Sequence, residues 1–199
     1  MSKLQEISEY LTYGQMNLIN DFRYNVLQLA MWTRAYLNAA ASSFGSLEGN
    51  TRKLHTVPGL FYNSLKQYMG EAIARAFQDF LFRHVLMLTH LIDAFMTNDK
   101  EAVDRYILES YQLVDQLSSF LASNNLYWNK DHWQLLISNY LRMTIDEIIA
   151  VFSGQFDRGI DIYDEIQYHA LLMADYMSRG LIANLNSGMN PNDKKDDFQ

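Results

Sequence analysis

Residues 71–98 read EAIARAFQDFLFRHVLMLTHLIDAFMTN, and this stretch decides the fold class. It contains no Gly or Pro, and its large apolar residues recur every three or four positions. At about 100° per residue these positions form one apolar stripe, which is typical of an amphipathic α-helix. His84 lies near the centre of that stripe. A helix of this length needs partners along most of its surface, so the stretch predicts a helical bundle.

The composition supports the same fold class. Nine Gly and two Pro among 199 residues are too few for a turn-rich β fold. We expect one helical-bundle domain at 1–186, followed by a disordered polar tail at 187–199. A net charge of −7, without a run of basic residues in the domain, argues against nucleic acid or a membrane as a partner.

The N-terminal residues and the absence of cysteine bear on location and chemistry. The first ten residues, MSKLQEISEY, form no apolar signal segment, and no apolar run is long enough to span a membrane. We therefore expect a soluble, cytoplasmic protein. The chain has no Cys, which excludes disulfides, thiolate metal sites and Cys nucleophiles.

Helical periodicity continues on both sides of the opening stretch. It predicts further long helices at about 15–43, 100–123, 131–152 and 155–186, with Asp99 as an N-cap and a short helix at 60–69. Residues 42–58 interrupt the pattern with two Gly and a Pro, so this segment is expected to cross one end of the bundle or fold over a site. The predicted fold is an all-α up-and-down bundle of about five main helices, ferritin-like in general shape.

Several polar or amphipathic residues interrupt these apolar faces and form the candidate ligand pocket: Asn25, Trp32, Tyr36, His84, Tyr140, Thr144, Glu147 and His169. Such residues either satisfy one another in the core or line a small pocket. The chain has no Gly-rich phosphate loop, no His-Glu-x-x-His, no Gly-x-Ser-x-Gly and no Glu-x-x-His pair of the di-iron bundles. We therefore expect a non-catalytic protein with no predicted cofactor. A divalent metal held by His84 and Glu147 is the alternative for the same region.

Six short segments carry a resemblance to a family. They are WTR at 32–34, YMGE at 68–71, RHV at 83–85, NLYWNKDHW at 125–133, YLRMT at 140–144 and MADYMSRG at 173–180. By their order and spacing the chain, from about residue 22 to residue 185, resembles an uncharacterised family of helical-bundle proteins from Bacillus- and Clostridium-type bacteria. In that family, histidines stand where this chain has Leu29, His84 and Tyr140, and with the carboxylate at Glu147 they resemble a metal site in a bundle core. Here Leu and Tyr replace two of the three.

Three hypotheses for the function follow. The first is a bundle that binds a small ligand or a partner through a partly polar core pocket. The second is a metal-binding, ferritin-like protein with oxidoreductase-like chemistry. The third is a structural homodimer module, because the chain has 13 Tyr, 11 Phe and 3 Trp. Apolar side chains also lie before the first helix or on its polar side: Tyr10, Tyr13, Tyr24, Leu27 and Met31.

Overall fold

Helices and short turns make up the described part of the chain. The computed structural model describes residues 11–42 and 45–188, and within these ranges it contains α-helices and no β-strand. The helices are α2 (Tyr13–Ser42), α3 (Leu47–Leu54), α4 (Val57–Met69), α5 (Glu71–Met96), α6 (Lys100–Asn124), α7 (Lys130–Phe152) and α8 (Phe156–Gly188). The prediction of an all-α fold is confirmed.

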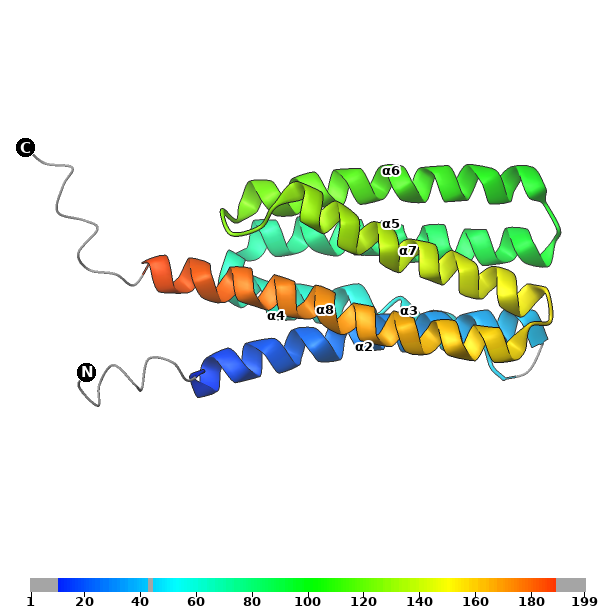
Figure 1. The fold of residues 1–199 in the computed structure, drawn as a ribbon, viewed down its shortest axis with the longest axis horizontal. Coiled ribbons are helices and arrows are strands. Elements are labelled where there is room, and N and C mark those ends of the chain that lie inside the picture. Colours follow the sequence, from blue (N-terminus) through cyan, green and yellow to red (C-terminus); the bar gives the residue numbers. More distant parts are fainter. Residues whose placement is uncertain (1–10, 43–44, 189–199) are drawn as a thin grey trace, which may run out of the picture.

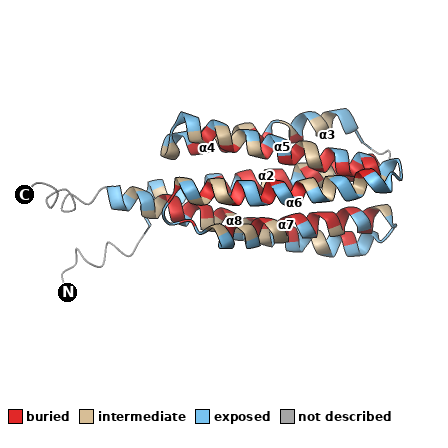
Figure 2. Cartoon of the chain, turned by 90° about the horizontal axis from the view of Figure 1, so that it is seen from above, coloured by how far each residue is buried: buried red, intermediate tan, exposed pale blue. Residues whose placement is uncertain are grey.

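The chain passes back and forth along one long axis (Figure 1). α2 crosses the molecule, α3 and α4 together return, and α5, α6, α7 and α8 then alternate in direction. α8 packs against α2, so the first and last helices of the described chain are neighbours and the bundle closes. Seen from above, α4 and α5 lie on one side, α7 and α8 on the other, and α2 and α6 between them (Figure 2).

The segment predicted as a long connection contains a helix of its own. Ser46 begins α3, and its hydroxyl accepts a hydrogen bond from the backbone N–H of Gly49 at 2.9 Å. Leu54 and Val57, at the junction of α3 and α4, are fully buried. Together the two short helices α3 and α4 bring the chain back along the bundle. A search for long apolar stripes does not detect this pattern.

Capping residues define most of the remaining helix ends. The carboxylate of Asp99 accepts from the N–H of Ala102, which confirms this predicted N-cap of α6. The side-chain oxygen of Asn129 accepts from the N–H of His132 and caps α7. Gly70, with φ of 80°, makes the one-residue turn between α4 and α5, where an L side chain would be strained. α8 continues through Gly188, two residues beyond the predicted domain end, and residues 1–10 and 189–199 lie outside the described ranges.

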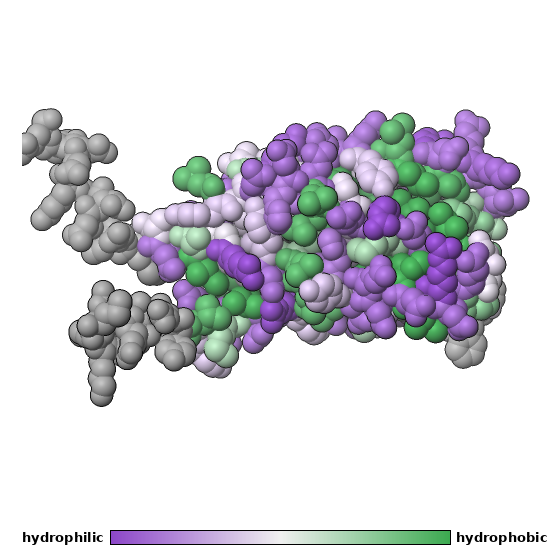
Figure 3. Space-filling model, in the orientation of Figure 1, coloured by the Kyte–Doolittle hydropathy of each residue, from purple (hydrophilic) through white to green (hydrophobic). Residues whose placement is uncertain are grey.

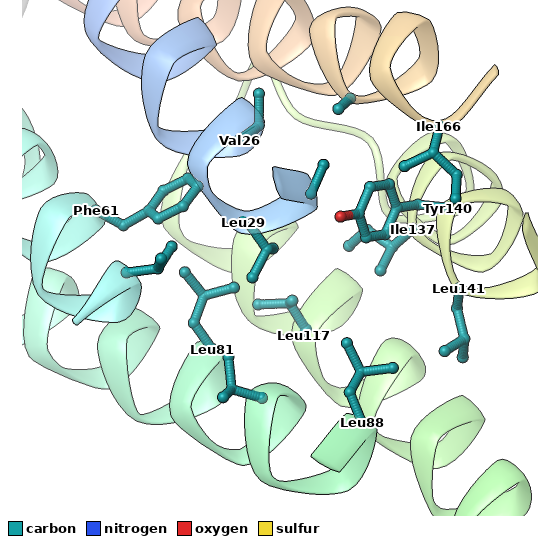
Figure 4. Close-up of a cluster of buried hydrophobic side chains, with 14 of the residues drawn as sticks. Val26, Leu29, Phe61, Leu81, Leu88, Leu117, Ile137, Tyr140, Leu141 and Ile166 are labelled. Carbon is teal, nitrogen blue, oxygen red and sulfur yellow. The ribbon is translucent and has the colours of Figure 1, made fainter. Parts of the chain in front are cut away.

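The buried side chains form a continuous core along the bundle. Figure 4 shows its middle, where leucines of α2, α5 and α6 face Tyr140 and Ile137 of α7. The apolar stripe of α5 faces this core, and His84 within it is 8% exposed. The central helix therefore packs as its periodicity predicts.

The corner between α6 and α7 is attached to α8 by a close contact. Trp128 and Trp133 are both buried, and their rings meet edge to face with centroids 5.8 Å apart. The indole of Trp128 lies directly against Gly180 of α8, so closely that a β-carbon at position 180 would overlap the ring. Gly180 is thus required by packing and not by a turn.

The surface mixes polar and apolar residues. On the face drawn in Figure 3, hydrophobic residues form separate patches among hydrophilic ones. No helix in residues 11–42 and 45–188 is long and apolar enough to cross a membrane.

Candidate functional site

A cavity of about 60 Å³ lies in the middle of the bundle. Residues of α2, α4, α5, α6, α7 and α8 line it, and most are aliphatic, among them Leu29, Leu81, Leu113, Leu117 and Ile137. Well-packed cores contain few voids larger than a water molecule. A void of this size, lined by all the long helices, is therefore the first candidate for a binding site.

Four side chains bring polar atoms to this apolar wall. They are His84 of α5, Ser110 of α6, and Trp133 and Tyr140 of α7. The hydroxyl of Tyr140 points into the interior of the bundle (Figure 4). Trp133, Ser110 and Tyr140 are 1%, 1% and 3% exposed, so bulk water does not reach these groups.

None of these four groups has a hydrogen-bond partner within the described residues. The hydroxyl of Ser110 and the indole N–H of Trp133 are buried and unpaired. The side chains of His84 and Tyr140 likewise make no hydrogen bond within the described residues. A buried polar group without a partner costs about 1–3 kcal/mol. Two such groups, the Ser110 hydroxyl and the Trp133 N–H, belong to residues that line this one cavity.

The serine on the cavity differs from other buried serines of the molecule. Ser118 and Ser178 donate to the carbonyl oxygen four residues earlier, at 2.8 and 2.7 Å. That is the ordinary solution for a serine inside a helix. Ser110 is equally buried and helical, but its hydroxyl makes no such bond.

Burial keeps the titratable groups at the cavity uncharged. It lowers the pKa of His84 to about 4, so the imidazole is neutral at neutral pH. Burial also raises the pKa of the Tyr140 hydroxyl far above its usual range, with a further contribution from the negative charge of Glu147. The cavity therefore offers neutral hydrogen-bonding groups.

A charged cluster lies close to Tyr140, between α2, α7 and α8. Arg34 donates to the Glu147 carboxylate at 2.6 Å and to the carbonyl oxygen of Gly159 at 3.0 Å, and its guanidinium lies over the Tyr163 ring at 4.4 Å. Burial raises the pKa of Glu147 to about 7, and the charge of Arg34 limits the rise. We call Arg34, Glu147, Tyr163 and the Gly159 carbonyl the Arg34 cluster. Its polar groups bind one another.

The eight residues of the predicted pocket separate into two sets. His84 and Tyr140 line the cavity. The other six have partners elsewhere: Asn25 with Ser64, Trp32 with Gln28, Tyr36 with Asp93, Thr144 with the Tyr140 carbonyl, Glu147 with Arg34, and His169 with the Leu136 carbonyl.

Sequence reasoning did not assign Ser110 and Trp133 to the pocket. Both lie on the apolar stripes of their helices, and the one sign in the sequence of a possible site is that each side chain carries a polar atom. That signal does not tell whether the atom has a partner. Ser118 donates to the carbonyl oxygen four residues earlier, and by position the Tyr106 carbonyl is available to Ser110 in the same way.

The described residues contain no group of three or more His, Cys, Asp and Glu placed to hold a metal ion. Glu147, one of the two predicted ligands, is engaged by Arg34 at 2.6 Å. A metal there would have to displace a guanidinium from a buried carboxylate.

Comparison with known proteins gives no relative from which a role could be inferred. No protein-family model, curated protein or solved structure matches this chain.

Proposed function

We propose that this bundle is a non-catalytic binding protein that takes a small molecule into the central cavity. The observation that carries the proposal is one largely apolar void lined by six helices, with four residues whose side chains make no hydrogen bond, His84, Ser110, Trp133 and Tyr140, in its wall. Small-molecule sites have this make-up, an apolar wall with a few polar groups that orient the ligand.

The groups at the cavity suit binding better than proton transfer. His84 is held neutral by burial, and no acid or base of the described chain forms a hydrogen bond with it. A general base works best with a pKa near the operating pH and an orienting partner. The cavity meets neither condition.

We also propose that the bundle is ferritin-like in general shape. Bundles of that class hold ligands and metals between facing long helices, near the middle of the molecule. The cavity lies in the corresponding place here, which supports the likeness. The metal-binding alternative has weaker support, because Glu147 is already paired.

Occlusion of the cavity tests the proposal. Ala170 of α8 lines the cavity and is fully buried, whereas Ala150 of α7 is equally buried but lies elsewhere in the core. The probes are xenon, isobutene, acetone, 2-propanol and acetate, each titrated against protein with isotope-labelled methionine methyls. Met173 and Met177 line the cavity and report on its contents.

We expect at least one probe to shift the Met173 and Met177 methyl signals in a saturable way. The same probe should act on Ala150→Val and lose its effect on Ala170→Val, because only the second substitution fills the void. Binding by no probe, or unchanged binding to Ala170→Val, would contradict the proposed function.

Self-association is a second candidate role, favoured by the outer face of α2. Tyr13, Tyr24 and Met31 are 78%, 57% and 39% exposed and lie within about 20° of one another on the helix. Leu27 is half-buried, and Tyr10 lies outside the described residues. We propose that this face pairs two copies as a homodimer.

Light scattering at micromolar concentration should give the mass of a dimer, and Tyr24→Glu should give a monomer of unchanged helicity. A substitution of the exposed Leu108 on α6 by Glu is the matched control. A monomeric wild-type protein would refute the dimer without affecting the cavity proposal.

A further inference from the structure

The wall of the central cavity consists almost entirely of hydrocarbon. Apart from His84, Ser110, Trp133 and Tyr140, every residue that lines it carries an aliphatic, phenyl or thioether side chain. The Ser110 hydroxyl and the Trp133 N–H have almost no accessible surface, so an occupant of the cavity does not reach them. At most His84 and Tyr140 remain to offer a polar contact.

Such a wall disfavours charged and polar occupants. Within the described ranges, no Lys, Arg, Asp or Glu lines the cavity, so an ion would be buried there without a counter-charge. A buried water typically makes about three hydrogen bonds, and at most two polar side chains are available to it. An uncharged polar molecule meets the same shortage, because it gives up its hydrogen bonds to bulk water on entry.

The volume limits the size of the occupant. An engineered apolar cavity of about 150 Å³ in another protein holds benzene, so about 60 Å³ corresponds to roughly two or three non-hydrogen atoms. Met173 and Met177 on the wall have flexible side chains, which permit some adjustment of shape.

We infer that the cavity selects a short hydrocarbon of about three carbon atoms, held by contact with the apolar wall and not by hydrogen bonds. This inference rests on the proposed function and specifies its ligand class. A diatomic gas also fits the volume, but it buries less apolar surface and should bind more weakly.

Four probes with the same number of non-hydrogen atoms test the class: propane, dimethyl ether, ethanol and formate. Affinities are measured from the shifts of the Met173 and Met177 methyl signals, with the gases applied under pressure. We expect propane to bind most tightly. Dimethyl ether and ethanol should bind at least about tenfold more weakly, because each buries an oxygen without adequate partners, and formate should not bind.

Two variant pairs test whether hydrogen bonds contribute. Tyr140→Phe removes only a hydroxyl from the wall and should leave propane the tightest ligand with unchanged affinity. Tyr36→Phe is its control, because Tyr36 is also buried but binds Asp93 and does not line the cavity. Ser110→Ala and its control Ser118→Ala should likewise leave the binding of every probe unchanged.

The outcomes separate the two proposals. Ethanol, dimethyl ether or formate binding as tightly as propane would overturn the ligand class and leave the proposed function standing. Ethanol binding that Tyr140→Phe abolishes and Tyr36→Phe preserves would also overturn the class, because it would show a hydrogen-bonded ligand. Benzene binding as tightly as propane would overturn the size limit. Methyl signals that respond to no probe, xenon included, would overturn both proposals.

Discussion

The polar side chains of this core fall into two groups that contain the same residue types. Away from the cavity several have partners: Tyr36 with Asp93, Trp32 with Gln28, His169 with the Leu136 carbonyl, and Ser118 with the Val114 carbonyl. Buried atoms without a partner also occur away from the cavity, in Thr33, His55, Asn125 and Trp128. At the cavity, Tyr140, Trp133, His84 and Ser110 have none among the described residues. Residue type alone therefore does not decide whether a buried polar group has a partner. Of the six buried side-chain atoms without a partner among the described residues, two belong to residues that line the cavity, Ser110 and Trp133.

The largest expected effect comes from the tryptophan on the cavity. Trp133 is 1% exposed and contacts the rings of Trp128 and Tyr176. Trp133→Ala should lower the free energy of unfolding by about 3–5 kcal/mol, because it removes a large side chain and enlarges an existing void. Trp32→Ala, at a half-buried and paired indole, should cost clearly less. Urea denaturation of both variants measures the difference, and equal losses would remove this distinction between the two groups.

The pH dependence of stability should differ in sign between the Arg34 cluster and the cavity. The pKa of Glu147 is raised from 4.5 to about 7. Its contribution to the free energy of unfolding is therefore complete below pH 4.5 and is lost as pH rises through about 7. The pKa of His84 is lowered from 6.5 to about 4, so its contribution is complete above pH 6.5 and is lost as pH falls through about 4.

Relative to wild type, Glu147→Gln should therefore gain stability as pH rises, and His84→Gln should gain it as pH falls. By the size of the two shifts, each change is at most about 3 kcal/mol. Urea denaturation from about pH 4 to about pH 8 measures both. Parallel curves for wild type and His84→Gln would show that the imidazole is not held neutral by burial.

The smallest expected effect compares two serines of α6. Ser118→Ala removes a hydrogen bond that exists and should cost about 1 kcal/mol. Ser110→Ala removes a hydroxyl without a partner and should be neutral or slightly stabilising in the absence of ligand. Thermal unfolding of the two variants side by side tests this. A loss at Ser110 as large as that at Ser118 would indicate that the unliganded protein already pairs the Ser110 hydroxyl, for example with water.

The sequence was informative wherever a short-range rule decides the structure. The 3.6-residue period of residues 71–98 predicted α5, and the position of Asp99 before a polar first turn predicted its role as a cap. The same rules missed α3, because its eight residues carry one buried position, Leu54, and no apolar stripe. Its Ser46 cap was the signal present in the sequence.

The candidate site could be predicted in part only. Periodicity placed both His84 and Tyr36 on buried faces, and it did so correctly. Whether such a group is satisfied depends on residues distant in sequence, such as Asp93 for Tyr36, which lies 57 positions away. A void depends on the fit between helices, and no local pattern in one helix records it. The pairing of Arg34 with Glu147, 113 positions apart, is of the same kind.

The Trp128 indole packs against α8 at Gly180, and this contact fixes the position of α8 along the bundle axis. A shift of α8 by one helical turn, about 5.4 Å, would bring Tyr176 or Asn184 to the indole in place of Gly180. Neither side chain leaves room for the ring. Ala170, Met173 and Met177 lie within three turns of Gly180 on the same helix. The contact with Trp128 therefore also fixes which of their atoms face the cavity. The shape of the cavity is thus determined partly at the corner between α6 and α7, through a glycine of α8 that does not line the cavity.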